Sequence, residues 1–540
     1  MSTSLPDPIL DGLQRGWRVY GGPSRPAAPE RLSCDVAIVG SGAGAGITAE
    51  LLSRAGLRVV IVEEGPLKSS RDFQQRESEA YPSLYQESAA RKTADKAINI
   101  LQGRCVGGST TVNWTSSFRT PVETLTHWRT HHGLADMGEA EMAPWFAQAE
   151  RRLNIGPWLT SPNQNNELLR TGAARLGIAA AGIQRNVKGC WNLGSCGMGC
   201  PTNAKQSMLV TTLPTALDAG ATLLVGTQVE RIELQGGRVQ ALQCRAVAVN
   251  GEPSANRGGT RIVARHVVVA GGAINSPALL LRSQLPDPHG LLGRRTFLHP
   301  VVISAATFAD KVQGWDGAPQ TLYSDHFLHT QPLDGPIGYK LEAPPLHPVI
   351  FASTLAGHGR AQAELLGQFA NTHSLLALMR DGFHPESVGG RVMLRDDGSP
   401  VLDYPLNDFV MDGARRAFLS MAEIQFAAGA RSVVPVHEMA EPYTRWAEAS
   451  KAIRELPMKP LLTRVVSAHV MGGCAMGGSE AQGVVRSDGT HWQVEGLSVH
   501  DGSLFPTSIG ANPQLSVYGL AAKLATGLAK RLGAAEVRLA

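Results

Sequence analysis

The chain has 540 residues and a formal net charge of +4, with 43% hydrophobic and 18% charged residues. Because this length exceeds the usual size of one domain, we expect two domains that share a large core. The small net charge gives no reason to expect nucleic acid as a partner, and the composition is that of a globular soluble protein. Seven cysteines, an odd number in so long a chain, argue against a disulfide framework.

The first residues, MSTSLPDPILDGLQRGWRVYGG, do not predict an export signal, since no basic segment followed by an apolar one is present. No run of about 18 uncharged apolar residues follows, so a transmembrane helix is not expected either. We therefore expect a cytoplasmic protein, and leave open peripheral membrane association or export together with a partner subunit.

An alternation of strand, turn and helix opens the chain. Residues 34–39 (CDVAIV) predict a short buried strand, residues 40–46 (GSGAGAG) a turn and residues 47–55 the start of a helix. A second strand is predicted within residues 57–65 (LRVVIVEEG). This order is typical of a dinucleotide-binding βαβ unit.

The turn carries the pattern GxGxx(G/A) on Gly40, Gly42 and Ala45. The first glycine makes the tight turn, the second lets a pyrophosphate approach backbone N–H groups, and the small third residue packs helix on strand. Glu63 ends the second strand, where its carboxylate would accept hydrogen bonds from ribose hydroxyls. Its neighbour Glu64 is the less favoured ligand because side chains alternate along a strand. The alternative is an ordinary turn between helix and strand, but the combined spacing favours a dinucleotide.

A second cluster of small residues follows at 103–114 (GRCVGGSTTVNW). Gly107 and Gly108 would let the backbone pass close to a flat ring, while Ser109 and Asn113 offer polar atoms at fixed offsets. A plain loop explains the cluster equally well, since glycines are common turn signals.

Residues 121–187 show apolar residues at helical spacing and predict helical packing without chemistry. A cysteine-rich stretch follows, in which Cys190, Cys196 and Cys200 form a C-x5-C-x3-C-P pattern. Thiolates so close together suit a soft metal or an iron–sulfur cluster, and a three-iron cluster would need only three ligands. The alternative is three packed thiols in a tight loop.

Residues 222–234 and 238–249 alternate as antiparallel strands. Residues 261–283 predict a strand, a glycine turn and a helix, and Gly271 and Gly272 would let this turn touch the same dinucleotide. A second ordinary connection from strand to helix is the alternative.

From about residue 299 to 460 the sequence changes to strand-like alternation, typical of a sheet-based substrate domain. The alternating segments are residues 300–309, 347–356 and 390–406, and a helix is predicted over residues 412–428. The apolar residues of this region favour core packing over a pocket lining.

The C-terminal part carries one histidine, His469, and one asparagine, Asn512, each beside small residues that would let backbone crowd a flat ligand. Histidine has an unperturbed pKa of about 6.5, which suits a base near neutral pH.

Taken together, these motifs resemble the glucose-methanol-choline (GMC) family of FAD oxidoreductases over nearly the whole chain. Residues 103–119 are similar to the first signature of that family and residues 271–283 to the second. The resemblance implies an α/β fold in which a Rossmann-like FAD-binding domain is interleaved with a mixed α+β substrate-binding domain. It places residues 30–120, 205–298 and 462–540 in the FAD-binding domain, and residues 121–204 and 299–461, with the cysteine-rich loop, in the substrate domain.

The resemblance implies FAD as the cofactor. Some members of the family attach the flavin to a histidine, but Val112 stands at that position, so noncovalent FAD is expected. The resemblance assigns two sets of residues to the adenosine end of FAD: Gly40, Gly42, Ala45 and Glu63 hold the adenosine diphosphate part, and Val229 reaches the adenine. It assigns two further sets to the flavin end: Gly107, Gly108, Ser109 and Asn113 lie along the flavin, and Asp501, Gly502 and Pro513 line the isoalloxazine ring.

His469 matches the catalytic histidine of the family, and Asn512 matches its second catalytic position. The implied reaction is oxidation of an alcohol to an aldehyde or ketone, with His469 as the base and hydride transfer to flavin N5. The form of the C-terminal motif favours an apolar or long-chain alcohol as substrate.

The cysteine-rich loop is similar to loops of some alcohol oxidases and of bacterial FAD glucose dehydrogenases, where a three-cysteine motif is linked to a three-iron cluster. The loop favours a dehydrogenase over an oxidase. An electron-acceptor protein or a quinone would then be a partner. Two alternatives stay open: a sugar or polyol dehydrogenase that passes electrons to a cytochrome or quinone, and a hydroxynitrile lyase that keeps FAD without using its redox chemistry.

Overall fold

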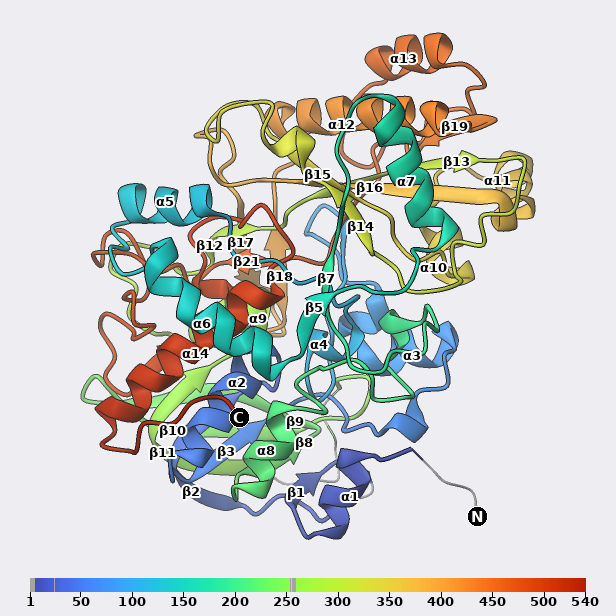
Figure 1. The fold of residues 1–540 in the computed structure, drawn as a ribbon. Helices are drawn as coiled ribbons and strands as arrows, with labels where there is room; N and C mark the ends of the chain where they lie inside the picture. Colours follow the sequence, from blue (N-terminus) through green and yellow to red (C-terminus); the bar gives the residue numbers. More distant parts are fainter. Residues whose placement is uncertain (1–4, 24, 253, 255–258) are drawn as a thin grey trace, which may run out of the picture.

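A largely parallel sheet forms the lower part of the molecule in Figure 1 and contains the N-terminal motif. The computed structural model describes residues 5–23, 25–252, 254 and 259–540. Both faces of this sheet are covered, so its central strand is a continuous apolar run in which Val36, Ala37 and Ile38 have no exposed surface. The strands, in spatial order, are β1 (Arg18–Gly21), β8 (Thr222–Val225), β3 (Val59–Val62), β2 (Arg31–Val39), β11 (Thr260–Val269), β10 (Arg238–Ala246) and β9 (Thr227–Gln235), with β22 (Leu497–Val499) paired to β11.

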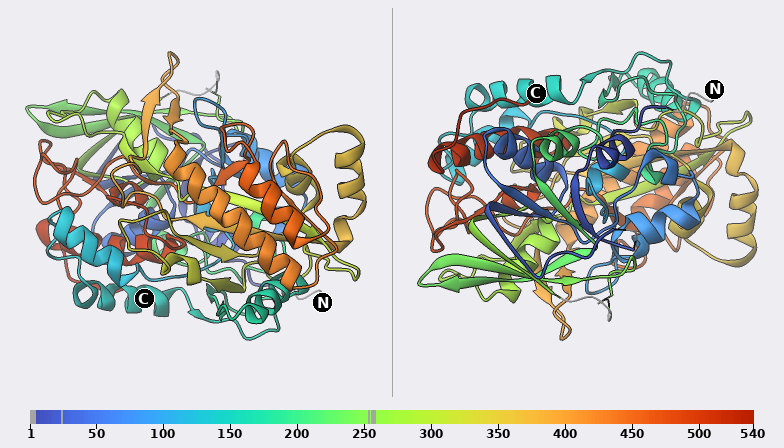
Figure 2. Two further views of the ribbon diagram at one scale, coloured as in Figure 1. Left: turned by 90° about the horizontal axis from the view of Figure 1, so that it is seen from above. Right: turned by 90° about the horizontal axis from the view of Figure 1, so that it is seen from below.

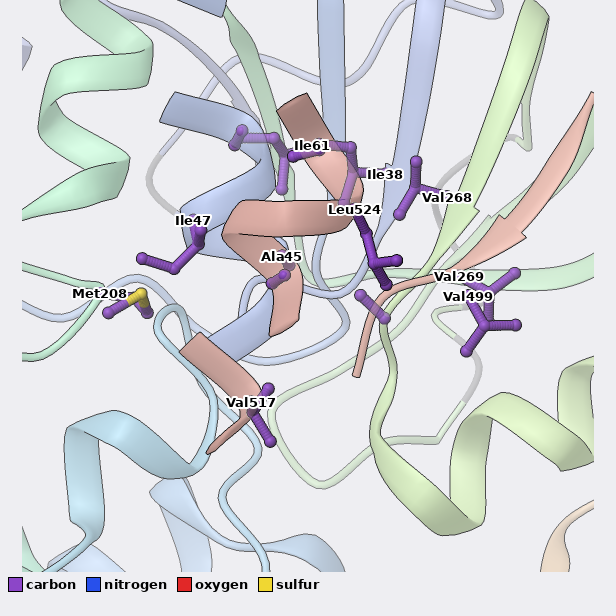
Figure 3. Packing of buried hydrophobic residues seen from close by; sticks show 14 of the residues in the cluster. Ile38, Ala45, Ile47, Ile61, Met208, Val268, Val269, Val499, Val517 and Leu524 are labelled. Atoms are coloured by element: carbon purple, nitrogen blue, oxygen red, sulfur yellow. The ribbon is translucent and has the colours of Figure 1, made fainter. Parts of the chain in front are cut away.

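The predicted βαβ unit is confirmed. Strand β2 leads through the glycine turn into helix α2 (Ala43–Arg54), and β3 returns parallel to β2. Helix α2 packs against the C-terminal helix α14 (Gln514–Arg531). Figure 3 shows Ala45 of α2 and Leu524 of α14 in one apolar cluster with strand residues Ile38 and Ile61.

One part of the later predictions for this sheet is wrong: residues 222–225 form β8, which pairs parallel with β1 and β3. Its four residues are all buried, as in a parallel strand covered on both faces. The other predictions are confirmed. Strands β9 and β10 pair antiparallel, and β10 pairs antiparallel with β11. Strand β11 then leads through Gly271 into helix α9 (Gly272–Arg282).

A second, mostly antiparallel sheet lies above the first in Figure 1. Its strands, in spatial order, are β4 (Ile98–Ile100), β20 (Val465–Ser467), β13 (Val301–Thr307), β16 (Thr372–Met379), β15 (Tyr339–Glu342), β14 (Leu322–Ser324) and β6 (Ala181–Gly182), with β19 (Ser432–Pro435) paired to β13. A four-stranded sheet consists, in spatial order, of β18 (Pro400–Asp403), β17 (Gly390–Leu394), β12 (Arg294–Phe297) and β21 (Met471–Gly472). A two-stranded sheet consists of β5 (Ile155–Pro157) and β7 (Gln184–Asn186).

Helix α12 (Asp408–Ala427) packs on strands β13 and β16 of the second sheet, and Figure 2 shows it lying across this sheet beside α13 (Trp446–Glu455). Among the described residues, none of the helices combines the length and apolar character needed to span a bilayer. The other helices are α1 (Pro8–Gln14), α3 (Glu77–Leu84), α4 (Ser109–Val112), α5 (Val122–His131), α6 (Glu139–Arg152), α7 (Gln164–Arg175), α8 (Thr212–Asp218), α10 (Pro348–Thr354) and α11 (Gly359–Gly367).

The fold class is therefore the predicted one: a Rossmann-like α/β domain interleaved with a mixed α+β domain. The helix predicted over 412–428 is α12, and residues 390–406 form the β17–β18 hairpin. The domain boundaries stay a prediction; β4 and β20 come from segments assigned to the first domain and pair with each other in the second sheet.

One predicted strand is wrong, because residues 347–356 contain helix α10. Pro348 occupies the first turn of that helix, where the missing N–H would have no helical partner and the fixed φ of proline suits a helix. The short apolar run there packs mainly through Phe351, so its period does not distinguish a strand from a single helical face.

We expect Gly44→Ala to destabilise the protein by about 1–3 kcal/mol or more. A Cβ on Gly44 would lie 1.6 Å from the carbonyl oxygen of His500, so the helix or the C-terminal segment must shift. Thermal melting of both proteins measures the effect. Gly527→Ala in α14 is the control, since its Cβ would meet only Arg531 Nη1, at 3.6 Å. Equal melting temperatures for the wild type and Gly44→Ala would contradict this close packing.

Candidate functional site

The first glycine turn forms one wall of a cavity of about 420 Å³. Gly40 has φ of 98°, and a Cβ there would lie 2.4 Å from the carbonyl oxygen of Ala270. Only glycine fits this left-handed and crowded position. The turn therefore leaves backbone exposed to the cavity at the N-terminus of α2, where N–H groups favour an anion.

Segments far apart in the sequence converge on this cavity. Besides the first turn, it is bordered by the start of α4, the β11–α9 turn and the segment after β22. The predicted cofactor residues that line it are Gly40, Gly42, Glu63, Gly108, Ser109, Val229, Asp501 and Gly502.

Glu63 directly follows strand β3 and is buried. Its Oε2 accepts a 2.5 Å hydrogen bond from Ser41 Oγ, and its Oε1 accepts from the backbone N–H of Gly65 at 2.8 Å. Burial nevertheless raises the pKa of Glu63 to about 7. A buried carboxylate beside a cavity can accept further hydrogen bonds from hydroxyl groups, which fits the ribose of a dinucleotide.

Glu64 also borders the cavity, but its side chain has protein partners. Burial opposes its ionisation, but the charge of Arg104 and the hydrogen bonds from Gln86 and Gln228 together outweigh burial, so the pKa of Glu64 lies below its usual value. The amides of Gln86 and Gln228 donate to its two carboxylate oxygens at 2.6 and 2.9 Å. The carboxylate oxygens of Glu64 therefore accept hydrogen bonds from side chains of the protein.

The second cluster of small residues lies against the first turn. A Cβ on Gly108 would be 2.7 Å from the Cα of Gly42, and the N–H of Gly107 donates to Ser41 Oγ at 3.0 Å. Asn113 does not border the cavity, since its side chain donates to Gln514 Oε1 at 2.7 Å. The predicted residues outside the cavity lining are Ala45, Gly107, Asn113 and Pro513.

Asp501 joins the C-terminal stretch to the second signature. Its Oδ2 accepts from the backbone N–H of Gly272 at 2.7 Å and from Ser276 Oγ at 2.5 Å. Its Oδ1 accepts from the N–H of Ser503. The carboxylate is thus used to hold two chain segments together at the cavity wall.

His469 lies between β20 and β21, next to Val470, whose carbonyl oxygen faces Gly502 of the cavity wall. Burial, and secondly the positive charge of Lys340, lower the pKa of His469 to about 3. Its Nδ1 lies 3.1 Å from Nδ1 of His299, a hydrogen-bond distance, so one of the two rings carries the shared proton. His469 is therefore neutral at pH 7, and in the substrate-free protein it is a weaker base than a free imidazole.

His299 is fixed by its backbone. Its φ of 48° is uncommon for a residue other than glycine, and its N–H donates to Asp381 Oδ1 at 3.0 Å. Asp381 is held in turn by the hydroxyl of Tyr404 at 2.8 Å. The ring of His299 is thus a rigid neighbour for His469.

Asn512 is buried in the loop before α14. Its Oδ1 accepts a 3.0 Å hydrogen bond from Lys340 Nζ, and its Nδ2 donates to Glu342 Oε2 at 3.2 Å. Since Lys340 also acts electrostatically on His469, the two predicted catalytic residues share one charged neighbour.

Sequence reasoning missed Lys340, Glu342 and His299. A signal was present for the first two, because residues 340 and 342 stand two apart in an apolar segment (YKLEA) and must share one face of a strand. Two opposite charges on one buried face of a strand predict an ion pair, because an unpaired buried charge is costly. Nothing in the sequence pairs His299 with His469.

The three cysteines of the predicted metal loop are free thiols. Among the described residues, no group of three or more His, Cys, Asp or Glu side chains is arranged to hold a metal ion. The loop is instead tied by Lys205, whose Nζ donates to the carbonyl oxygens of Thr111, Asn113 and Cys196 at 2.6–2.9 Å. The described chain thus gives no ligand set for an iron–sulfur cluster.

The fold and the cavity together define an α/β protein with a dinucleotide-type site beside a second, sheet-based domain. The family model for the N-terminal part of GMC oxidoreductases matches residues 81–301, and the model for the C-terminal part matches residues 385–521. The chain belongs to the GMC oxidoreductase family.

Relatives agree with this assignment. An uncharacterized GMC-type oxidoreductase of Mycobacterium tuberculosis is 31% identical over 501 residues, which cover 92% of this chain and 76% of the relative. The long-chain-alcohol oxidase FAO4A of Arabidopsis thaliana is 28% identical over 510 residues, or 91% of this chain and 68% of the plant enzyme. Among solved structures, pyridoxine 4-oxidase from Mesorbium loti shares the fold, with a TM-score of 0.67, 19% identity and coverage of 91% of this chain and 98% of that one.

We expect Glu63→Gln to flatten the pH dependence of stability in the FAD-free protein. The folded-state pKa of about 7 lies above the ordinary value of 4.5, so the folded state binds the proton more tightly than the unfolded state. The stability that Glu63 contributes is complete below about pH 4.5 and is lost as the pH rises through 7. Removing the ionisable group removes that loss.

The measurement is the melting temperature between pH 5 and 8, with Glu455→Gln, an exposed glutamate on α13, as the control. The wild type and the control should lose stability over this range more steeply than Glu63→Gln. Identical slopes in all three proteins would show that Glu63 does not titrate there.

Proposed function

We propose that the protein oxidises an alcohol to an aldehyde or ketone with FAD as its noncovalent cofactor, and that His469 is the base. The observation that carries this proposal is the buried arrangement of a neutral histidine and a fixed amide around Lys340, beside the wall of a dinucleotide-type cavity. Family membership supports the reaction class, because relatives include enzymes named as long-chain-alcohol oxidases.

The cavity supports FAD as the dinucleotide. Its glycine turn, the exposed N-terminus of α2 and the buried carboxylate of Glu63 match the needs of a pyrophosphate and a ribose. Similar structures include a formate oxidase studied for its FAD modification. When bound, FAD supplies the acceptor for the hydride that leaves the alcohol carbon. The residues proposed to hold it are the predicted ones that line the cavity, namely Gly40, Gly42, Glu63, Gly108, Ser109, Val229, Asp501 and Gly502.

As base, His469 takes the proton from the substrate hydroxyl. This role requires an unprotonated nitrogen toward the substrate. We assign the shared proton to His469: it then donates its Nδ1–H to Nδ1 of His299, 3.1 Å away, and its Nε2 is the free acceptor. Asn512 donates an amide N–H to the same oxygen and orients it.

An apolar alcohol is the proposed substrate class. Phe118 and Tyr323 form an edge-to-face pair at 5.0 Å beside Lys340, so the surroundings of the catalytic pair are partly aromatic. The plant relatives are named for long-chain alcohols, and this chain spans about two thirds of their length. A panel of alcohols, sugars and polyols, read anaerobically by flavin absorbance, decides between substrate classes and also tests for a non-redox lyase.

The electron acceptor is a separate question, decided by reoxidation of the reduced flavin with oxygen or with artificial acceptors. Our sequence-based preference for a dehydrogenase depended on the cysteine-rich loop. Relatives and similar structures are named as oxidases, so oxygen is the first acceptor to test.

We expect His469→Ala to slow flavin reduction by an active alcohol about 10²–10⁴-fold, since a positioned base contributes that much. Anaerobic stopped-flow absorbance gives the rate, and flavin content and melting temperature show that the variant is folded. His384→Ala is the control, because that ring stacks on Phe409 away from the cavity lining. A rate within about threefold of the wild type would remove His469 from the mechanism.

A further inference from the structure

A buried ion pair lies directly behind the proposed catalytic amide. Lys340 and Glu342 stand two apart on β15, so both side chains lie on one face of the strand. Their residues are 1% and 0% exposed, and Lys340 Nζ lies 3.0 Å from Glu342 Oε1. Taking two charges out of water costs several kcal/mol per ion, roughly, unless their remaining hydrogen-bonding capacity is used. Their other partners therefore show what the pair does.

Lys340 has three partners inside the protein, the first being its ion pair with Glu342. Besides Glu342, it donates to Oδ1 of Asn512 at 3.0 Å, and Nζ lies 3.0 Å from the centre of the Phe118 ring. Burial lowers the pKa of Lys340 to about 8, and Glu342 opposes that shift, so the group is charged at pH 7. Lys340 is thus held inside the protein, where it donates to Asn512 and acts on His469 through its charge.

The pair fixes which way the Asn512 amide points. An ammonium group can only donate hydrogen bonds, and an ionised carboxylate can only accept them. Oδ1 must therefore face Lys340 and Nδ2 must face Glu342, as the distances of 3.0 and 3.2 Å show. A flipped amide would place N–H groups against the ammonium and an oxygen against the carboxylate, which is unfavourable at both ends.

We propose that the Lys340–Glu342 pair is a positioning device that presents Asn512 to the substrate as a hydrogen-bond donor. One Nδ2–H is used by Glu342, which leaves the second for the substrate oxygen. A donor suits that oxygen, because negative charge develops on it as His469 takes its proton. This inference rests on the proposed function and deepens it, by assigning two positioning residues and the direction of one hydrogen bond.

The first test concerns the amide itself and needs no substrate. In the FAD-loaded full chain, labelled with ¹⁵N in asparagine, the side-chain NH₂ signals of Asn512 are identified by their loss in Asn512→Ala. We expect Lys340→Met/Glu342→Leu, which replaces both charges by apolar groups, to shift these signals and broaden them through exchange. Unchanged Asn512 signals would overturn the proposal.

The matched control is Arg152→Met/Glu50→Leu, which removes another buried ion pair, with an N–O distance of 2.8 Å and side chains 14% and 0% exposed. It lies between α6 and α2, and neither residue lines the cavity. This control should lower the melting temperature and leave the Asn512 signals in place. If it moves them equally, the first result reflects general loosening and the proposal is wrong.

The second test measures anaerobic flavin reduction with 1-decanol. It uses 2-methyl-2-decanol as a binding probe, because this tertiary alcohol has no hydrogen on its carbinol carbon and cannot give up a hydride. Removing the Lys340–Glu342 pair should lower the reduction rate about tenfold to a hundredfold, and change the affinity for the tertiary alcohol by less than about threefold. In the Asn512→Ala background, the same removal should have a clearly smaller effect on the rate, because only the charge effect of Lys340 on His469 then remains.

Independent, multiplying effects of the two changes would overturn the positioning role. If the wild type reduces its flavin with no member of the alcohol panel, the proposed function fails, and the amide signals alone decide whether the pair positions Asn512.

Discussion

The structure depends on the close approach of backbone segments at the first glycine turn. Gly40 lies against the carbonyl of Ala270, and Gly44 lies against the carbonyl of His500. Side chains at either position would push helix α2 away from the β11–α9 turn and from the C-terminal stretch. Because no side chain intervenes, three segments that are hundreds of residues apart form one wall.

This contact determines where the proposed catalytic residues stand. The segment that packs on Gly44 continues into Asp501, whose carboxylate holds Gly272 and Ser276, and a few residues later into Asn512. His469 reaches the same place through Val470, which faces Gly502. The cavity wall and the segments that carry His469 and Asn512 therefore belong to one packing arrangement.

Much of the fold follows from local sequence patterns. The βαβ unit, the β17–β18 hairpin and helix α12 are predictable because their apolar residues repeat at the spacing of a strand or a helix over enough residues. The strand predicted at 347–356 is wrong because a short apolar run fits the period of a helix as well as that of a strand. For the site, Glu63 and Gly40 could be found by their spacing. Lys340 could not be connected to Asn512, since the two residues are 172 positions apart in the chain and meet only in the folded structure.

Two buried lysines connect the segment 103–119 to its neighbours in the fold. Lys205 donates to the carbonyls of Thr111 and Asn113, and Lys340 lies on the ring of Phe118. Burial lowers the pKa of both ammonium groups, so each depends on a complete set of acceptors to stay charged. A shift of the segment would withdraw acceptors from both lysines at once. The segment that borders the cavity is thus fixed from the cysteine-rich loop on one side and from the Asn512 site on the other.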